Sequence, residues 1–226
     1  MEPEALRIDL RHAEGIVTGI VTWLIHERRI VEAILFSIPV CHNSAMRLTN
    51  TELCARARHA AEDLSTLFVM GAYGSRLTAS EKERLIEAYA YNQKPERREM
   101  ILAADESVFA FDCSGFVKGL LWGFEGRSDH PYGGAEKDSN EVPDHWSDEF
   151  FSHCTSKSDK FLHLVPGEML WLHCHCGIYI GDGLAAECSP SFHNRVQITS
   201  VLHPRKGYMT RYWAMHGFLP YVDYKD

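Results

Sequence analysis

Residues 175–183 read His-Cys-Gly-Ile-Tyr-Ile-Gly-Asp-Gly. Apolar residues occupy every second position up to Ile180, and a turn signal follows at Asp182-Gly183. Such alternation is typical of a β-strand with one face in the core. His175 and Gly177 share one face of the expected strand, and the glycine leaves space beside the imidazole for a neighbouring side chain. The opposite face is expected in the core and carries Cys176, Ile178 and Ile180.

The segments on either side of this strand extend it into a sheet. Further strands are expected at residues 168–173, 184–188 and 195–199, because each is a short run of apolar and β-branched residues. A last apolar and aromatic segment, residues 208–224, is expected to pack across the sheet. Residues 124–148 are polar and rich in Gly, Asp and Pro, which predicts a long loop.

The upstream part of the chain has helical patterns instead. Capping-box patterns begin at Thr49 and at Thr78, and each predicts a helix start. The second helix is expected to run to about residue 91 and to be closed by Pro95. A third is expected after Asp112. Helices first and strands later predict an α+β domain, with N-terminal helices packed on a central antiparallel β-sheet.

The chain divides at about residue 45. Residues 1–45 are expected to form a helical leader or N-terminal extension, and residues 46–226 the domain proper. The apolar blocks at residues 16–25 and 30–40 are each too short to cross a bilayer, so no stable membrane insertion is expected. An acidic start argues against a signal peptide in this leader.

Charge and cysteine usage exclude two classes of protein. A net charge of −8 argues against a nucleic-acid binder, because such proteins neutralise phosphates with a basic face. Seven cysteines in 226 residues argue against a small secreted disulfide scaffold. Because their number is odd, at least one thiol is free for chemistry.

Cys113 is the candidate nucleophile. Asp112 is a good helix N-cap, which would place Cys113 in the first helical turn. There the free backbone N–H groups and the helix dipole favour a thiolate and can receive an oxyanion. Gly115 and Gly119 leave room for another backbone to approach. The alternative is a buried structural cysteine near a helix start.

His175 is the candidate base. A neutral imidazole can take the thiol proton and later return it to a leaving amine. The alternative is a strand histidine whose ring is satisfied by a backbone group.

The two motifs together resemble a known family. The run Asp112-Cys113-Ser114-Gly115-Phe116, followed by the motif at residues 175–183, resembles the NlpC-type cell-wall cysteine peptidases, which have a papain-like fold. The upstream stretch at residues 68–74 is similar to the Tyr-x-x-Gly-Gly segment of that family. The resemblance covers roughly residues 46–224.

This resemblance implies a catalytic set. Cys113 would be the nucleophile, His175 the base, and Glu187 the polar third residue. The family more often has His, Asn or Gln at that third position, and a Glu there could raise the imidazole pKa. Asp112 and Ser114 are implied as substrate contacts, although helix capping is an alternative for Asp112.

The family usually has Tyr where this chain has Phe68, and Tyr73 is a possible substitute in substrate binding. The implied reaction is hydrolysis of peptidoglycan stem peptides, most often between D-glutamate and the diamino acid. It needs no cofactor and no metal, and it implies a cell-wall or extracellular location.

Strand parity tests the role of Glu187 without the family. A strict two-residue hairpin at Asp182-Gly183 would pair Ile178 with Glu187 and place the carboxylate on the face opposite His175. We therefore predict an odd-length turn, such as a three-residue loop with a left-handed glycine.

Other functions remain open from the sequence alone. The run His173-Cys174-His175-Cys176 suggests zinc, but adjacent strand residues point to opposite faces, and the Cys-x-x-Cys spacing of structural zinc is absent. We therefore expect no metal there. An acyl or amide transferase on the same scaffold is one rival. A catalytically silent module that binds peptidoglycan peptides is the other.

Overall fold

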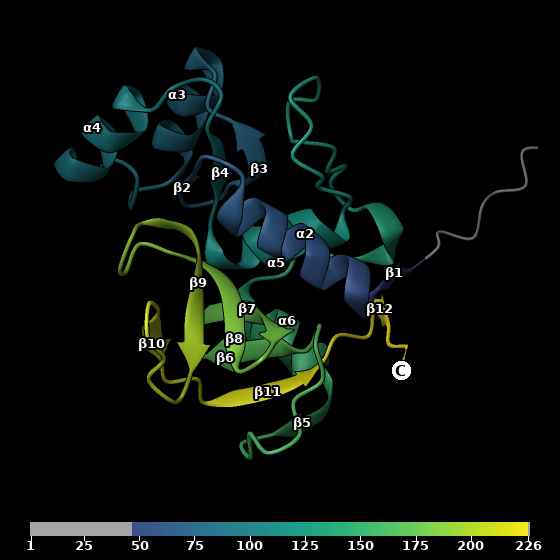
Figure 1. Cartoon of the computed structure of the whole chain (residues 1–226). Coiled ribbons are helices and arrows are strands. Elements are labelled where there is room, and N and C mark those ends of the chain that lie inside the picture. Colours follow the sequence, from purple (N-terminus) through teal and green to yellow (C-terminus); the bar gives the residue numbers. More distant parts are fainter. Residues whose placement is uncertain (1–46, 226) are drawn as a thin grey trace, which may run out of the picture. The chain divides into compact units, whose positions relative to one another are not determined.

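The computed structural model describes residues 47–225 (Figure 1). The expected leader at residues 1–45 lies outside the described residues. The helices are α2 (Asn50–Glu62), α3 (Ala79–Ala88), α4 (Pro95–Ala103), α5 (Cys113–Leu121) and α6 (Ser147–His153), with a 3₁₀ turn η1 (Ser139–Glu141). None of the helices in this part of the chain is both long and apolar enough to cross a membrane.

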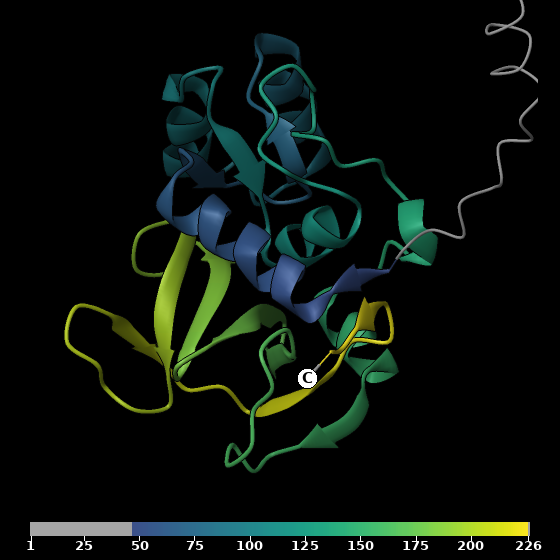
Figure 2. The same ribbon diagram turned by 45° about the vertical axis from the view of Figure 1, so that its right-hand side comes forward.

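A seven-stranded sheet forms one layer. Its strand order is β10-β9-β8-β7-β6-β11-β5, and every neighbouring pair is antiparallel except β10 with β9. Figure 2 shows how strongly this sheet curls. The strands are β5 (Thr155–Ser158), β6 (Met169–Leu172), β7 (His175–Gly181), β8 (Leu184–Ser189), β9 (Arg195–Val201), β10 (Met209–Arg211) and β11 (Met215–Phe218).

A smaller sheet has the order β2-β4-β3 and was not expected from the sequence. Its strands are β2 (Thr66–Phe68), β3 (Tyr73–Arg76) and β4 (Phe109–Phe111), and a two-stranded pair joins β1 (Leu48–Thr49) to β12 (Val222–Asp223). Helices α2 and α5 lie between the two larger sheets (Figures 1 and 2). The domain is mixed α and β, which is compatible with the expected α+β class.

The helix starts follow the capping signals. Thr49 and Glu52 form a complete capping box at α2, and the Thr78 hydroxyl accepts a hydrogen bond from the Glu81 N–H at α3. The predicted end of the second helix was wrong, because α3 stops at Ala88. Pro95 opens the next helix, α4, at a position where its missing N–H costs nothing.

The last segment also differs from the prediction. Residues 208–224 do not pack across the sheet but supply strands to it. Strand β10 extends one edge beside β9, and β11 inserts between β6 and β5. These pairings join segments far apart in the chain, so local patterns do not reveal them.

The hairpin between β7 and β8 decides which way Glu187 points. The turn itself is a tight pair, Asp182-Gly183, with both residues left-handed, so the prediction of an odd-length turn was wrong. A bulge between Tyr179 and Gly181 supplies the extra residue instead. Glu187 therefore pairs with Gly177 and lies on the face of His175, as the parity argument required.

Candidate active site

The N-terminus of α5 is held by Asp112. One carboxylate oxygen of this N-cap accepts a hydrogen bond from the Gly115 N–H at 2.6 Å, and the other accepts one from the Gly71 N–H at 2.7 Å. Gly115 is required here, because a Cβ on it would lie 1.9 Å from the Ala72 carbonyl oxygen. The expected close approach of a second backbone is thus confirmed, and it fixes where Cys113 begins the helix.

Cys113 is half-buried at this helix start. Its pKa is lowered to about 5, and the largest cause is a hydrogen bond from the Cys176 thiol. Burial alone would raise the pKa, but this hydrogen bond has the larger effect. The His175 ring then lowers the pKa further through a hydrogen bond and its positive charge, and the Ser114 N–H adds to the effect. Cys113 is therefore a thiolate at neutral pH.

His175 begins strand β7, and its side chain is only 11% exposed. Burial works against a charged ring, but hydrogen bonds and charges from Cys113 and Glu187 overcome it and raise the pKa to about 9. This is the direction expected for a Glu at the third position. Because Nε2 lies 2.6 Å from the Glu187 Oε2, Nδ1 is the nitrogen left to face the thiol.

Glu187 is fully buried on β8 and makes no contact with solvent. Burial disfavours its charge, yet hydrogen bonds from His175 and Arg211 keep its pKa below the usual value. The Thr199 hydroxyl donates a further hydrogen bond at 2.7 Å. A buried carboxylate with this many donors is a fixed anion that orients and charges the imidazole.

Arg211 and Trp213 belong to the site but were missed by the sequence analysis. The Arg211 guanidinium donates to the Glu187 carboxylate from Nη2 at 2.7 Å and from Nε at 3.1 Å. The Trp213 ring stacks on His175 with 5.4 Å between ring centres. Gly177 makes room for this ring, since a Cβ there would lie 3.0 Å from it. The sequence itself carries no signal that singles out Arg211, although a buried Glu generally needs a positive charge beside it.

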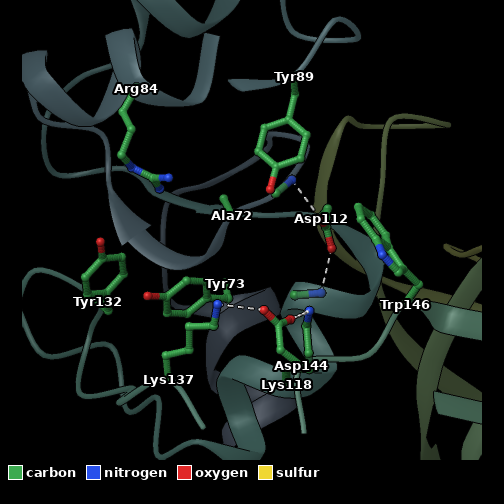
Figure 3. A pocket seen from close by; sticks show the side chains of 12 residues that line it. Ala72, Tyr73, Arg84, Tyr89, Asp112, Lys118, Tyr132, Lys137, Asp144 and Trp146 are labelled. Carbon is green, nitrogen blue, oxygen red and sulfur yellow. Dashed lines mark hydrogen bonds and ion pairs between the residues drawn. The ribbon is translucent and has the colours of Figure 1, made fainter. Parts of the chain in front are cut away.

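A cleft opens beside the thiol. An apolar cavity of about 290 Å³ is bordered by Met70, Cys113 and Ser114. A second, polar cavity of about 340 Å³ adjoins it (Figure 3). Because Asp112 and Trp146 border both cavities, the two cavities lie next to each other at the start of α5.

The polar cavity gathers cations and phenols. Arg84, Lys118 and Lys137 surround it, and both lysines pair with Asp144, Lys137 at 2.8 Å (Figure 3). Tyr73, one of the predicted substrate-binding residues, lies here. This cavity can take a polar or anionic part of a ligand, whereas the cavity beside the thiol suits an apolar one.

The three residues predicted to contact substrate differ in how available their side chains are to a ligand. Ser114 borders the apolar cavity, but its hydroxyl donates to the Asp112 carboxylate at 3.1 Å. Asp112 is only 3% exposed and caps the helix. Tyr73 stacks on Tyr132 and is not among the residues that border the cavity beside Cys113.

The expectation of no metal at residues 173–176 assumed that all four residues lie in one strand. His173 and Cys174 do not lie in the strand but in the turn before it, where Cys174 has a left-handed backbone. Their side chains therefore do not alternate, and they lie together with Asp148.

Comparisons with models of known protein families and with curated proteins found no match for this chain.

Proposed function

We propose that this protein is a cysteine peptidase or amidase that hydrolyses amide bonds through a thioester on Cys113, on a papain-like scaffold of the NlpC type. The observation that carries the proposal is the pairing of a half-buried thiol at a helix start with an imidazole that a buried carboxylate holds. Between about pH 5 and pH 9 the two groups form a thiolate–imidazolium pair.

Acylation uses each of these groups. The Cys113 sulfur attacks the substrate carbonyl carbon, and the oxyanion forms next to the first turn of α5. There Asp112 already occupies the Gly115 N–H, whereas the Cys113 N–H at the first helical position is free of the helix's own hydrogen bonds. His175 gives its proton to the nitrogen as the C–N bond breaks, and an amine leaves.

Deacylation reverses the proton transfer. The neutral His175 ring takes a proton from water, and the resulting hydroxide attacks the thioester carbon. The C–S bond breaks, a carboxylic acid is released, and the thiolate–imidazolium pair is restored. Glu187 keeps the ring oriented through both steps and is itself held by Arg211.

The proposed substrate is a peptidoglycan stem peptide, cleaved between D-glutamate and the diamino acid, which implies a cell-wall or extracellular role. This choice rests on the family resemblance. The polar cavity is consistent with it, because Arg84, Lys118 and Lys137, although each pairs with a carboxylate of the chain, offer N–H donors to the carboxylates of such a peptide.

The test is digestion of purified peptidoglycan by the wild type and Cys113→Ala, with mass spectrometry of the released fragments. The wild type should release peptides ending in D-glutamate, and Cys113→Ala should release none while keeping its circular dichroism spectrum. Adding an amine acceptor separates the transferase, which would form amide-linked products in place of free acid. Equal products from both proteins would refute the proposal.

A further inference from the structure

A cluster of three side chains of the types that bind metals lies beside the apolar cavity, which Asp148 and Cys174 border. Asp148 comes from α6, while His173 and Cys174 come from the turn between β6 and β7. The Cys174 Sγ lies 3.4 Å from the His173 Nε2 and 3.8 Å from the Asp148 Oδ2. The His173 Nδ1 lies 3.2 Å from the same carboxylate oxygen.

These side chains lie near enough to one another to become the ligands of a small cation, since one atom from each lies within 4.8 Å of the other two. Tetrahedral zinc with one sulfur, one nitrogen and one oxygen ligand at ordinary bond lengths places its ligand atoms roughly 3.3–3.6 Å apart. The separations here span 3.2 to 3.8 Å, but Nδ1 of His173 faces Asp148 and Nε2 faces Cys174, so the ring must rotate to bring a single nitrogen within reach of an ion shared by all three. The His173 side chain is 83% exposed and free to turn either nitrogen inward.

The Asp148 carboxylate is already oriented. The Asp148 Oδ1 accepts hydrogen bonds from the Trp171 indole N–H at 2.9 Å and from the Cys174 N–H at 2.8 Å. These bonds leave Oδ2 pointing at the other two ligands. Supporting hydrogen bonds of this kind are what fix the ligands of a metal site.

We propose that Asp148, His173 and Cys174 bind a thiophilic divalent cation, with Zn²⁺ as the best match, and that the bound ion slows chemistry at Cys113. Thiolate and imidazole ligands favour zinc over magnesium or calcium, which prefer oxygen. Binding releases the Cys174 thiol proton to water as the Zn–S bond forms. The fourth position is left for water or another ligand.

The expected effect on Cys113 follows from their shared surroundings. Asp148 and Cys174 border the same cavity as Cys113, and the Cys113 Sγ lies 3.8 Å from the Cys174 carbonyl oxygen. An ion held there obstructs the approach to the thiolate and lowers its nucleophilicity by its charge. Inhibition of hydrolysis rests on the proposed function, whereas metal binding does not.

Binding is tested on the full chain by competition with a chromophoric zinc chelator. The wild type should bind one Zn²⁺ at this site, and Cys174→Ser should bind it at least about 10- to 100-fold more weakly, the loss typical even of a supporting partner. The exposed His163→Ala variant is the matched control and should bind like the wild type. Cys113→Ala should also retain the ion.

Cobalt substitution identifies the ligands. With Co²⁺ the wild type and Cys113→Ala should show a thiolate-to-metal charge-transfer band, and Cys174→Ser should not. If Cys174→Ser binds as tightly as the wild type, the proposal is overturned. Loss of the band in Cys113→Ala alone would place the ion on the catalytic pair and would also overturn it.

The effect on Cys113 is measured by iodoacetamide alkylation, which needs no peptidase activity. In the wild type, saturating Zn²⁺ should slow alkylation of Cys113 at least tenfold relative to EDTA, and in Cys174→Ser the two rates should agree. Equal rates in the wild type would refute the inhibitory effect. A protein that binds Zn²⁺ at this site but digests no peptidoglycan in EDTA would refute the proposed peptidoglycan hydrolysis and leave the metal site standing.

Discussion

Removing the imidazole should make Cys113 markedly less reactive at mildly acidic pH. In the wild type, the pKa of Cys113 is lowered to about 5, and His175 is one of the groups responsible. His175→Ala removes both its hydrogen bond and its charge. The Cys176 thiol and the Ser114 N–H remain, so the pKa should rise toward the ordinary value of 9.0 without having to reach it.

The size of the effect follows from two opposing factors. At pH 6 a thiol with a pKa of about 5 is about 90% thiolate, whereas one at 9.0 is about 0.1% thiolate. The higher-pKa thiolate is intrinsically more nucleophilic, by about 40- to 100-fold for a Brønsted coefficient of about 0.4–0.5. The rate of Cys113 alkylation at pH 6 should therefore fall by up to about 10- to 20-fold in His175→Ala.

The assay is iodoacetamide labelling at pH 6 in EDTA, with peptide mapping of the modified cysteines over time. Cys113 should be labelled first in the wild type, ahead of the exposed Cys174, whose pKa is raised by the loss of some hydration and by the charge of Asp148. His163→Ala is the control for loss of a histidine elsewhere and should behave like the wild type. If Cys113 reacts equally fast in His175→Ala and in the wild type, the proposed thiolate–imidazolium pair is refuted.

Three further outcomes are expected from the same site. In EDTA, kcat/KM should fall below about pH 5, where Cys113 is protonated. It should also fall above about pH 9, where His175 loses the proton that it gives to the leaving amine. A pH-independent kcat/KM would contradict both assignments. Arg211→Met should lower the free energy of unfolding by at most about 3–5 kcal/mol, because Glu187 stays buried with His175 alone to balance its charge. Urea denaturation measures this change, and an unchanged midpoint would show that Arg211 does not stabilise the buried Glu187 charge. Gly115→Ala should cost at least about 1–3 kcal/mol in the same assay, because its Cβ meets a carbonyl oxygen at 1.9 Å; stability equal to the wild type would show that the helix start is not tightly packed.

The sequence predicted the parts of the fold that depend on local signals. The capping threonines mark the starts of α2 and α3, and alternation gives β7 with its observed ends. The three strands of the small sheet were missed, because each has only three or four residues and carries no periodic pattern. Pro95 was misread because a proline that cannot continue one helix can begin the next.

In the candidate site, too, the residues in local motifs were predicted and those placed by long-range contacts were not. Cys113, His175 and Glu187 were predicted, and the structure brings them together. Glu187 reaches the right face through a bulge before the turn, and no residue pattern distinguishes that bulge from a three-residue loop. Arg211 is the last residue of β10, and Trp213 follows it; β10 pairs in parallel with β9, and the register of that pairing depends on contacts across the sheet.

The most direct test of the thioester chemistry is the intact mass of the protein, quenched in acid soon after mixing with a stem peptide. The wild type should carry an added mass equal to the acyl part of the peptide. Peptide mapping should place it on Cys113, hydroxylamine should remove it, and Cys113→Ser should lack it. Peptide cleavage that proceeds in Cys113→Ser at the wild-type rate, with no adduct on the wild-type protein, would contradict a cysteine nucleophile at the start of α5.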